Sequence, residues 1–329
     1  MHIHSRSLKH FRRKLNQGAV FFRMLSLFRL KEASFMAASP LFTGCATALV
    51  TPFLPDGSLD EAALRRLIAR QNQAGMDALV LLGTTGEPCT LTMRERERVI
   101  EIGLEAAGSM PVIVGTGAND TRRAIEYARQ ARELGASGQL SVTPYYNKAT
   151  QTGLLRHYEA ILDACPLPII LYNVPSRTGV CIRPETAAKL SQHPLIAGIK
   201  EASGDFTLIA DLLAQPGMMP VYCGNDDLIW PMMAMGAVGA VSVVSNVAPK
   251  QTLAVTCAAQ AGRACEAAAA QRELLPLIRA LFAQVNPIPV KAALSMLGLC
   301  GDVLRLPLTP MEEPGRETLR RLLSRQAFL

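Results

Sequence analysis

One lysine of the chain stands where an amine could attack a carbonyl carbon. Lys200 directly follows the apolar run 195–199. The other lysines of residues 37–329 do not end such a run: Lys148, Lys189, Lys250 and Lys291. An amine at the end of a buried strand is desolvated, which favours the neutral form that attacks a carbonyl and forms a Schiff base. Lys200 is therefore the candidate nucleophile, and an ion pair with a neighbouring carboxylate is the alternative.

Hydroxyl side chains end two other apolar runs and could exchange protons with this amine. Tyr172 ends the run 168–172, and Thr84 and Thr85 follow the run 78–82. A tyrosine hydroxyl beside a lysine can move protons through the carbinolamine and enamine steps, and a threonine hydroxyl can relay them. The glycine-flanked turn 83–87 also exposes backbone N–H groups that suit a small carboxylate.

The histidines and acidic residues do not predict a metal site. His157 lies in a helical pattern and His193 in a turn, positions typical of surface or structural histidines. The other histidines lie near the N-terminus: His2, His4 and His10. No group of His, Asp and Glu has metal-ligand spacing. We therefore expect a site without a metal or a cofactor.

The cysteines and the hydropathy pattern indicate the compartment. All eight cysteines occur singly, without a C-x-x-C pair. This pattern indicates reduced, buried thiols rather than disulfides or a zinc site, and reduced thiols are typical of cytoplasmic proteins. No apolar run reaches the roughly 18 residues that a membrane span needs. We expect a cytoplasmic protein without a membrane partner.

The net charge of +7 comes from the N-terminus. Residues 1–36 contain eight of the 34 basic side chains and one of the 27 acidic ones, so residues 37–329 carry 26 of each. A neutral body gives no reason to expect nucleic-acid binding by the fold.

Residues 1–36 form a basic leader, which we expect to be disordered or absent from the mature protein. The leader resembles a targeting segment or a membrane-surface helix, but Arg23 and Arg29 interrupt its apolar part, which argues against a secretory signal. We favour Met36 as the true start, with organelle targeting and an ordered arm as alternatives. The alternative function, from a different class, is that of a leader that binds anionic lipid or nucleic acid beside a catalytically idle body.

Short apolar runs alternate with longer helical patterns from residue 44 onward. The eight runs are 44–50, 78–82, 112–115, 138–142, 168–172, 195–200, 220–223 and 237–243. The helical patterns between them start with N-cap residues, and these are Ser58 with Glu61, Thr92 with Glu95, and Asn119 or Asp120. Runs that are apolar on both faces, each followed by a helix, predict a parallel sheet covered by helices.

Eight strand and helix units predict an α/β fold, a (β/α)8 TIM barrel. The first run ends in Thr51-Pro52-Phe53, without the Gly-x-Gly-x-x-Gly turn of a doubly wound nucleotide-binding sheet. We expect the barrel over residues 41–248 and a C-terminal helical subdomain over residues 249–329. In such a barrel the reacting groups lie at the C-terminal ends of the strands.

Six segments, taken in order, resemble the dihydrodipicolinate synthase family of class I aldolases. They are Thr-Ala-Leu-Val-Thr-Pro-Phe at 47–53, Gly-Thr-Thr-Gly-Glu at 83–87, Thr-Pro-Tyr-Tyr-Asn-Lys at 143–148, Tyr-Asn-Val-Pro-Ser-Arg-Thr-Gly at 172–179, Ile-Lys-Glu-Ala-Ser-Gly-Asp at 199–205 and Asn-Pro-Ile-Pro-Val-Lys at 286–291. The resemblance covers about residues 41–329.

The resemblance implies a 4-hydroxy-tetrahydrodipicolinate synthase reaction in the diaminopimelate route to lysine. Pyruvate would form a Schiff base with Lys200, and the enamine would attack the aldehyde of L-aspartate 4-semialdehyde. Tyr172 would donate and accept protons, linked through Thr84 to Tyr146 of the neighbouring subunit. Such a relay implies at least a dimer, and the family is usually a homotetramer built as a dimer of dimers.

Three further positions take their roles from the family motifs. Thr85 matches the residue that binds the pyruvate carboxylate, and Val241 matches the position whose backbone carbonyl lies beside pyruvate. Arg177, in the Ser-Arg-Thr-Gly motif, matches the group that holds the carboxylate of the semialdehyde. A planar guanidinium suits this task because it can make two parallel charge-assisted hydrogen bonds to one carboxylate.

Two positions depart from the members of the family that lysine inhibits. Asn119 and Tyr145 match their lysine site, but Arg96 and Arg123 stand where those members have a histidine and a glutamate. Each guanidinium should repel a cationic ligand by on the order of 1 kcal/mol or more at such a distance. We expect weak or absent inhibition by lysine.

Sister aldolases are the alternative within the same superfamily. N-acetylneuraminate lyase and related enzymes share the lysine, the first tyrosine and the Gly-x-Thr-Gly-Glu turn. They generally lack the Tyr-Tyr-Asn loop combined with Ser-Arg-Thr-Gly, so this combination favours the synthase.

Overall fold

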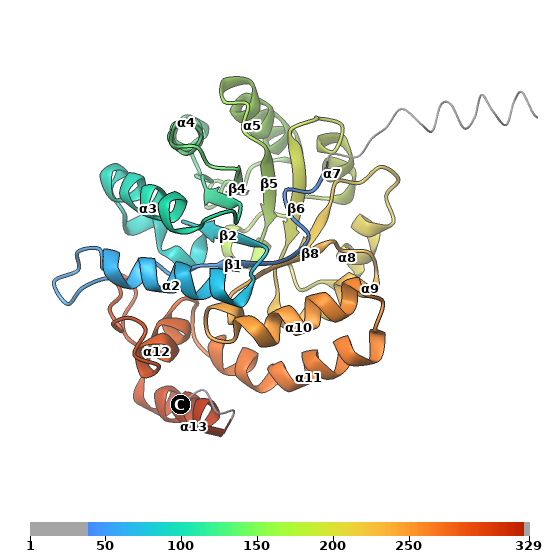
Figure 1. The fold of residues 1–329 in the computed structure, drawn as a ribbon. Coiled ribbons are helices and arrows are strands. Elements are labelled where there is room, and N and C mark those ends of the chain that lie inside the picture. Colours follow the sequence, from blue (N-terminus) through green and yellow to red (C-terminus); the bar gives the residue numbers. More distant parts are fainter. Residues whose placement is uncertain (1–38, 326–329) are drawn as a thin grey trace, which may run out of the picture. The chain divides into compact units, whose positions relative to one another are not determined.

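Eight parallel strands close into a barrel in the computed structural model, which describes residues 39–325 (Figure 1). The strands follow one another around the barrel in chain order, and each pairs in parallel with the next. Their bounds are β1 Gly44–Ala48, β2 Ala78–Leu81, β3 Val112–Gly115, β4 Gly138–Val142, β5 Ile169–Asn173, β6 Ile196–Glu201, β7 Val221–Cys223 and β8 Gly239–Ser242. The predicted (β/α)8 barrel is confirmed, and a strand lies at each predicted apolar run, although β5 and β6 each end one residue beyond it.

Burial on both faces explains why these runs form strands. Every residue of β2, β3 and β5 is buried, because one face of each strand lines the barrel interior and the other faces the surrounding helices. β-Branched residues such as Val112, Ile113 and Val114 suit this pleated, two-sided packing. The apolar pattern of these runs therefore predicts the strands of the barrel directly.

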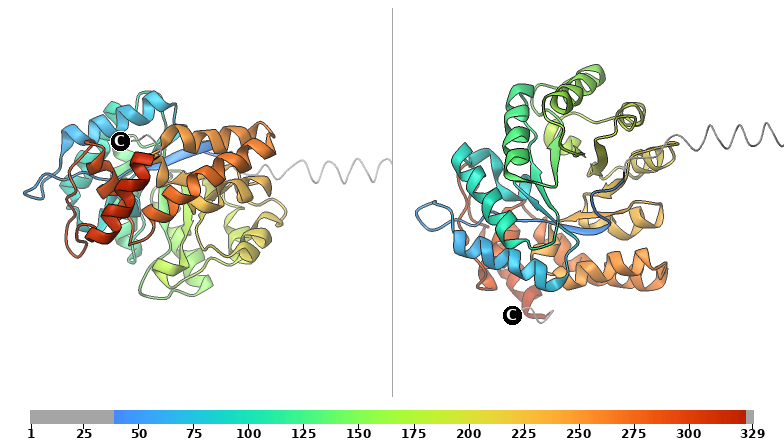
Figure 2. Two further views of the ribbon diagram at one scale, coloured as in Figure 1. Left: turned by 90° about the horizontal axis from the view of Figure 1, so that it is seen from below. Right: turned by 45° about the horizontal axis from the view of Figure 1, so that its top comes forward.

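Helices surround the barrel and extend beyond it at the C-terminus (Figures 1 and 2). The α-helices are α2 Glu61–Ala74, α3 Met93–Ala106, α4 Thr121–Leu134, α5 Gln151–Ala164, α6 Pro175–Thr178, α7 Pro184–Leu190, α8 Phe206–Leu213, α9 Ile229–Ala234, α10 Pro249–Gln260, α11 Ala264–Leu281, α12 Ile288–Met296 and α13 Glu313–Arg325. Short 3-10 turns follow three strands, and they are η1 Thr84–Gly86 with η2 Pro88–Thr90, η3 Asp226–Leu228, and η4 Val244–Asn246.

Two of the predicted helix starts are confirmed and one is wrong. Thr92 and Glu95 form a capping box at the start of α3, and Asp120 caps α4. Helix α2 is capped by Asp60 rather than by Ser58, since the Asp60 side chain accepts from the backbone of Ala63. Ser58 instead bonds to Asp56 in a turn closed by an antiparallel bridge, so the chain is still extended there.

The C-terminal helices continue the helix layer. Helix α10 packs against β1, β8 and α2, and α11 runs beside α10 and contacts α13, as two views agree (Figures 1 and 2). Helix α10 lies after the expected boundary between residues 248 and 249, yet it packs on the barrel strands. The division into a barrel and a C-terminal subdomain at this boundary therefore stays a prediction. The leader, residues 1–36, lies outside the described residues.

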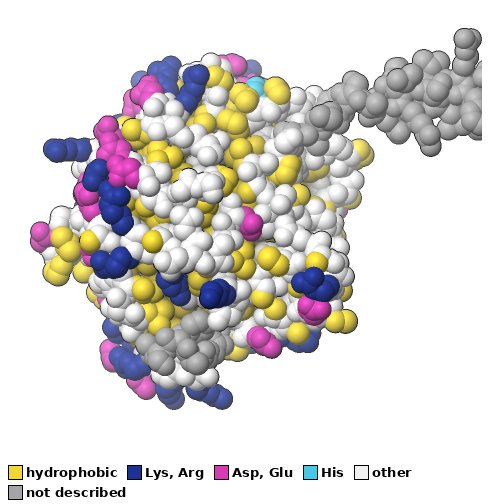
Figure 3. All heavy atoms as spheres, viewed as in Figure 1, with side chains coloured by type: hydrophobic (Ala, Val, Ile, Leu, Met, Phe, Trp, Pro, Cys, Tyr) yellow, Lys and Arg dark blue, Asp and Glu magenta, His cyan; other side chains and the backbone are white. Residues whose placement is uncertain are grey.

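The helices, the surface charges and the cysteines can be compared with what the sequence predicts about partners and compartment. In residues 39–325 no helix is long and apolar enough to cross a membrane. Acidic and basic side chains lie next to one another on the face seen in Figure 3, in keeping with a neutral body. All eight cysteines are free, as predicted. The prediction that all of them are buried is wrong, because Cys89, Cys257 and Cys265 are exposed.

Candidate active site

The Lys200 amine lies inside the C-terminal mouth of the barrel. Lys200 is the fifth residue of β6 and is 5% exposed. It lines a cavity of about 190 Å³, here called the inner cavity. Its Nζ atom lies 4.4 Å from the centre of the Tyr172 ring on the neighbouring strand β5. The structure therefore brings together the predicted nucleophile and the predicted proton-transfer residue.

The ion-pair alternative for Lys200 is wrong within the described residues. The carboxylate next to it in sequence, Glu201, accepts hydrogen bonds from Asn173 Nδ2 at 2.7 Å and from the backbone N–H of Ser203 at 2.6 Å. No carboxylate of residues 39–325 forms an ion pair with Lys200. The amine is left facing the inner cavity.

The turn after β2 brings both predicted threonines to the same cavity. Thr84 and Thr85 form most of η1, and both line the inner cavity beside Lys200. The hydroxyl of Thr51 donates to the carbonyl of Gly86 at 2.7 Å, which ties this turn to the segment after β1. The threonine hydroxyls are therefore held by a rigid turn rather than by a free loop.

A buried ion pair, which no motif or spacing in the sequence predicts, connects this turn to the C-terminal helices. Glu87, directly after η1, forms an ion pair with Lys291 of α12, and both side chains are buried. The backbone N–H of Arg305 donates to the second oxygen of Glu87 at 3.2 Å, and Lys291 also donates to the carbonyl of Val303 at 2.7 Å. Burial lowers the pKa of Lys291, and the Glu87 carboxylate opposes that shift.

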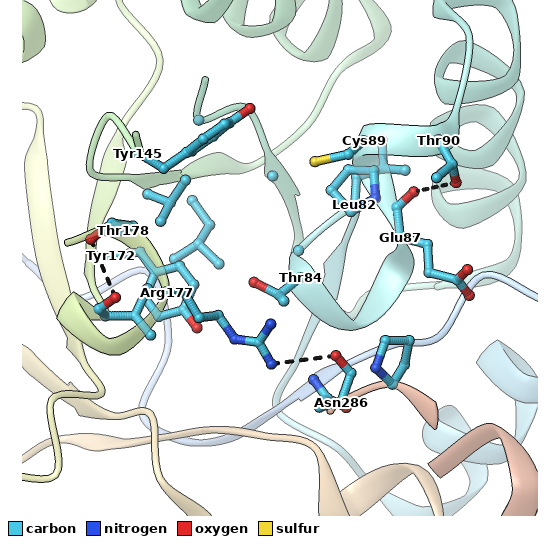
Figure 4. A pocket seen from close by; sticks show the side chains of 18 of the residues that line it. Leu82, Thr84, Glu87, Cys89, Thr90, Tyr145, Tyr172, Arg177, Thr178 and Asn286 are labelled. Carbon is cyan, nitrogen blue, oxygen red and sulfur yellow. Dashed lines mark hydrogen bonds between the residues drawn. The ribbon is translucent and has the colours of Figure 1, made fainter. Parts of the chain in front are cut away.

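Arg177 and Asn286 connect the two sides of the cavity mouth. Arg177, in α6, donates to the backbone carbonyl of Asn286 at 3.3 Å, and the Asn286 amide donates to Thr85 Oγ1 at 2.9 Å. Figure 4 shows the Arg177 guanidinium directed at Asn286, with Thr84 facing the same space. Asn286 lies in a motif quoted for the family resemblance, but no role for it followed from the sequence.

A second, larger space continues outward from the inner cavity. This outer cavity has a volume of about 300 Å³ and shares the walls formed by Thr84, Tyr172 and Arg177. Tyr145 closes its far side, and burial raises the pKa of the Tyr145 hydroxyl (Figure 4). The inner cavity therefore has an open approach lined largely by apolar side chains.

Tyr146 does not reach this cavity within one chain. Its side chain is 89% exposed, and its backbone has a φ of 72°, a left-handed conformation that is uncommon outside glycine. The backbone thus directs Tyr145 inward and Tyr146 outward. The prediction that Tyr146 acts on a neighbouring subunit stays a prediction.

The segments that follow β7 and β8 form another part of the cavity wall. Val241 is buried in β8, whereas Val243, two residues later, lines the inner cavity. Asp226 accepts from the backbone N–H groups of Val243 at 2.9 Å and Val244 at 2.8 Å. Burial raises the pKa of Asp226, while its hydrogen bonds and the charge of Lys200 oppose that shift. The role predicted for Val241 stays a prediction.

The two arginines that depart from the family's lysine site converge on one ring. The guanidinium of Arg96 is buried 3.8 Å from the centre of the Tyr127 ring and donates to the carbonyl of Gly115 at 2.7 Å. Burial lowers the pKa of Arg96 to about 10. The guanidinium of Arg123 lies 5.9 Å from the same ring and pairs with Glu126.

The fold and the strand-end site define a (β/α)8-barrel enzyme. The model of the dihydrodipicolinate synthetase family matches residues 41–326. The chain belongs to this family and, like its curated relatives, is a lyase of the 4-hydroxy-tetrahydrodipicolinate synthase type.

Relatives and solved structures agree with this assignment. The 4-hydroxy-tetrahydrodipicolinate synthase of Exiguobacterium sp. (strain ATCC BAA-1283 / AT1b) is 51% identical over 273 residues, which cover 82% of this chain and 93% of the relative. The dihydrodipicolinate synthase of Thermotoga maritima superposes with a TM-score of 0.86 at 43% identity, covering 88% of this chain and all of that one.

A third similar structure was solved with a bound ligand. It is the chloride-inhibited dihydrodipicolinate synthase of Acinetobacter baumannii in complex with pyruvate, with a TM-score of 0.85 and 45% identity. The match covers 87% of this chain and 99% of that one. These relatives favour the synthase over the sister aldolases as the family of this chain.

Proposed function

We propose that the chain condenses pyruvate, held as a Schiff base on Lys200, with L-aspartate 4-semialdehyde. The observation that carries this proposal is the Lys200 amine, buried at the inner cavity above the Tyr172 ring and without an ion-pair partner among residues 39–325. The pyruvate complex of the Acinetobacter baumannii enzyme supports the choice of keto acid.

The reaction then proceeds through covalent catalysis by the amine. The neutral Lys200 amine attacks C2 of pyruvate, and loss of water from the carbinolamine gives the iminium. Loss of a proton from C3 gives the enamine, whose C3 forms a bond to the aldehyde carbon while the aldehyde oxygen takes up a proton. Attack of the substrate's own amine on C2 cyclises the product and frees Lys200.

The other residues serve this sequence of steps. Tyr172 donates and accepts the protons, and Thr84 relays them to Tyr146 of a neighbouring subunit. Thr85 binds the pyruvate carboxylate beside the carbonyl of Val241, and Arg177 binds the carboxylate of the semialdehyde. The position of Thr84, Thr85 and Arg177 around the same inner cavity as Lys200 supports these roles.

A relay that needs Tyr146 of a second copy makes the active form an oligomer. The 89% exposure of Tyr146 supports this, because the side chain does not reach the cavity of its own chain and is free to contact another copy. We propose a homotetramer, a dimer of dimers, that works in the cytoplasm on the route to diaminopimelate and lysine.

Lysine inhibits this enzyme weakly or not at all. The convergence of Arg96 and Arg123 on the Tyr127 ring supports this, since it places two positive charges where a cationic effector would have to bind. Initial rates measured with rising lysine test the proposal. A submillimolar inhibition constant would overturn it.

Trapping of the covalent intermediate tests the central step. Borohydride reduction in the presence of pyruvate should add a reduced pyruvyl group to the chain, and peptide mass mapping should place it on Lys200. The variant Lys200→Ala should gain no adduct, whereas Lys189→Ala, which changes a lysine on α7, should be trapped as wild type. An adduct on any other lysine contradicts the mechanism.

A further inference from the structure

The residues directly after the candidate catalytic pair bond to each other. Strands β5 and β6 pair Tyr172 with Lys200, and the next pair in register is Asn173 with Glu201. Successive side chains of a strand point to opposite faces, so Asn173 and Glu201 lie on the face turned away from the cavity. There, Asn173 Nδ2 donates to Glu201 Oε2 at 2.7 Å, and both residues are fully buried.

The hydrogen-bond partners of this pair fix the orientation of both side chains. Asn173 Nδ2 also lies 3.5 Å from Cys181 Sγ, a weak acceptor, so the Glu201 carboxylate is its strong acceptor. The backbone N–H of Ile182 donates to Asn173 Oδ1 at 2.9 Å, so the amide nitrogen must face Glu201. The backbone N–H of Ser203 donates to Glu201 Oε1 at 2.6 Å. The pair therefore ties β5, β6, the loop after β6 and the segment before α7 into one network.

The carboxylate of this pair is buried without a cation among its described contacts. Burial raises the pKa of Glu201, and the hydrogen bonds from Asn173 and Ser203 oppose that shift. A buried acceptor that loses its donor costs more than the hydrogen bond itself, because no water replaces the donor. The network is therefore sensitive to the chemical type of each partner.

The start of the same strand pair shows why the register of β5 and β6 needs to be fixed near the site. The register between β5 and β6 shifts after Ile169, which pairs with Ile196, while Ile170 pairs with Gly198. The register of the two strands thus changes by one residue within the pair, and the same change at Lys200 would turn its side chain away from the cavity. The pair Asn173–Glu201 lies at the opposite end, next to the reacting groups.

We propose that Asn173 and Glu201 are positioning residues that fix Lys200 and Tyr172 in register and hold the adjacent carboxylate away from the amine. This inference rests on the roles proposed above for Lys200 and Tyr172. It assigns no contact with substrate to either residue of the pair.

Exchanging the amide of Asn173 and the carboxylate of Glu201 between the two positions tests the proposal. Asn173→Asp sets two carboxylates against each other, and Glu201→Gln sets two amide donors against each other. The double variant restores a donor and an acceptor with the direction of the hydrogen bond reversed. Glu201→Asp, which retracts the carboxylate by one methylene, is the mildest single change.

The readout is the rate at which pyruvate and borohydride modify the folded protein, followed by intact mass. Each single variant should be trapped about tenfold or more slowly, and the double variant should recover most of the wild-type rate. The control Thr47→Val removes the buried bond from Thr47 to Gln71 between β1 and α2. It should lower the melting temperature without slowing trapping.

The outcomes separate this inference from the proposed function. Without an adduct on Lys200 in the wild type, the proposed function itself fails. With that adduct present, folded single variants that are trapped at the wild-type rate overturn the positioning role. A double variant that folds but is trapped no faster than the singles overturns it too. If Asn173→Asp does not fold, Glu201→Asp and the double variant decide in the same way.

Discussion

The amide of Asn286 donates to the hydroxyl of Thr85 across 201 residues of sequence, at 2.9 Å. This bond joins the loop before α12 to the turn after β2, so the C-terminal helices contribute to the wall of the inner cavity. The same residue accepts from Arg177 through its backbone carbonyl. Asn286 is thus in contact with both residues proposed to bind the carboxylates of the two substrates.

Replacement of Asn286 by Ala should weaken pyruvate binding more than semialdehyde binding. The change removes the donor to Thr85 but keeps the backbone carbonyl that holds Arg177. A net hydrogen bond of about 1 kcal/mol corresponds to a rise of roughly fivefold in the KM for pyruvate. Initial rates with both substrates varied measure the two KM values separately.

The variant Thr85→Val supplies the control for this prediction. It removes the other side of the same bond, so Thr85→Val with Asn286→Ala should cost less than the sum of the two single changes. Equal effects on the two KM values, or strict additivity, would show that Asn286 does not act through Thr85.

The buried pair of Glu87 and Lys291 should dominate the stability of the turn after β2. Lys291→Met leaves the carboxylate of Glu87 buried without its cation, which typically costs about 3–5 kcal/mol of unfolding free energy. Adding Glu87→Gln removes the unpaired charge and should recover part of the loss. Urea denaturation followed by circular dichroism gives these values.

An exposed lysine serves as the reference for that experiment. Lys250→Met, at the start of α10, removes the same charge from an exposed side chain and should change the unfolding free energy by less than about 1 kcal/mol. A stability of Lys291→Met close to that of Lys250→Met would mean that the buried ion pair contributes little.

The fold follows from the sequence because its strands are buried on both faces. A run such as Val112–Gly115 contains no polar side chain that could face solvent, so it predicts a strand buried on both faces. The helix starts at Thr92 and Asp120 are marked by side chains that cap the helix locally. The prediction of Ser58 as the cap of α2 is wrong because this serine bonds to Asp56 instead. Local sequence features thus predict the strands and helices well, but they predict the residues at which these elements begin and end less well.

The site was predictable where one residue at a strand end carries the chemistry, and not where a pair does. Lys200, Tyr172 and Thr84 were singled out by type and by position after an apolar run. Asn286 and Glu201 were not, because their partners lie in other elements and only the closed barrel brings them together. Spacing in the sequence holds no record of such contacts.

His157 should make the protein less stable in mild acid. Its ring is buried, Nδ1 lies 2.9 Å from Thr121 Oγ1 and Nε2 has no partner among the described residues. Burial lowers the pKa of His157 from 6.5 to about 4. Between these two values the unfolded chain binds the proton that the folded chain refuses, so the unfolding free energy falls as the pH falls from 6.5 to 4.

The comparison of wild type with His157→Gln over this range measures the effect. The pKa difference corresponds to about 3 kcal/mol at most, so the wild type should lose more stability than the variant between pH 7 and pH 4. Parallel stability curves for the two proteins would mean that the imidazole titrates normally in the fold.

The exposure of Tyr146 leads to a complementation experiment between two inactive chains. If each site combines Lys200 of one subunit with Tyr146 of its neighbour, Lys200→Ala and Tyr146→Phe chains should rescue each other. In a mixed dimer, the site built on the Tyr146→Phe chain keeps its own lysine and receives an intact tyrosine, so about half of the sites in mixed dimers regain activity. Co-expression with two affinity tags isolates these mixed oligomers, and their rate per site is compared with each parent. A tyrosine that serves its own chain leaves every site of the mixture defective, and the rate then stays at the level of the parents.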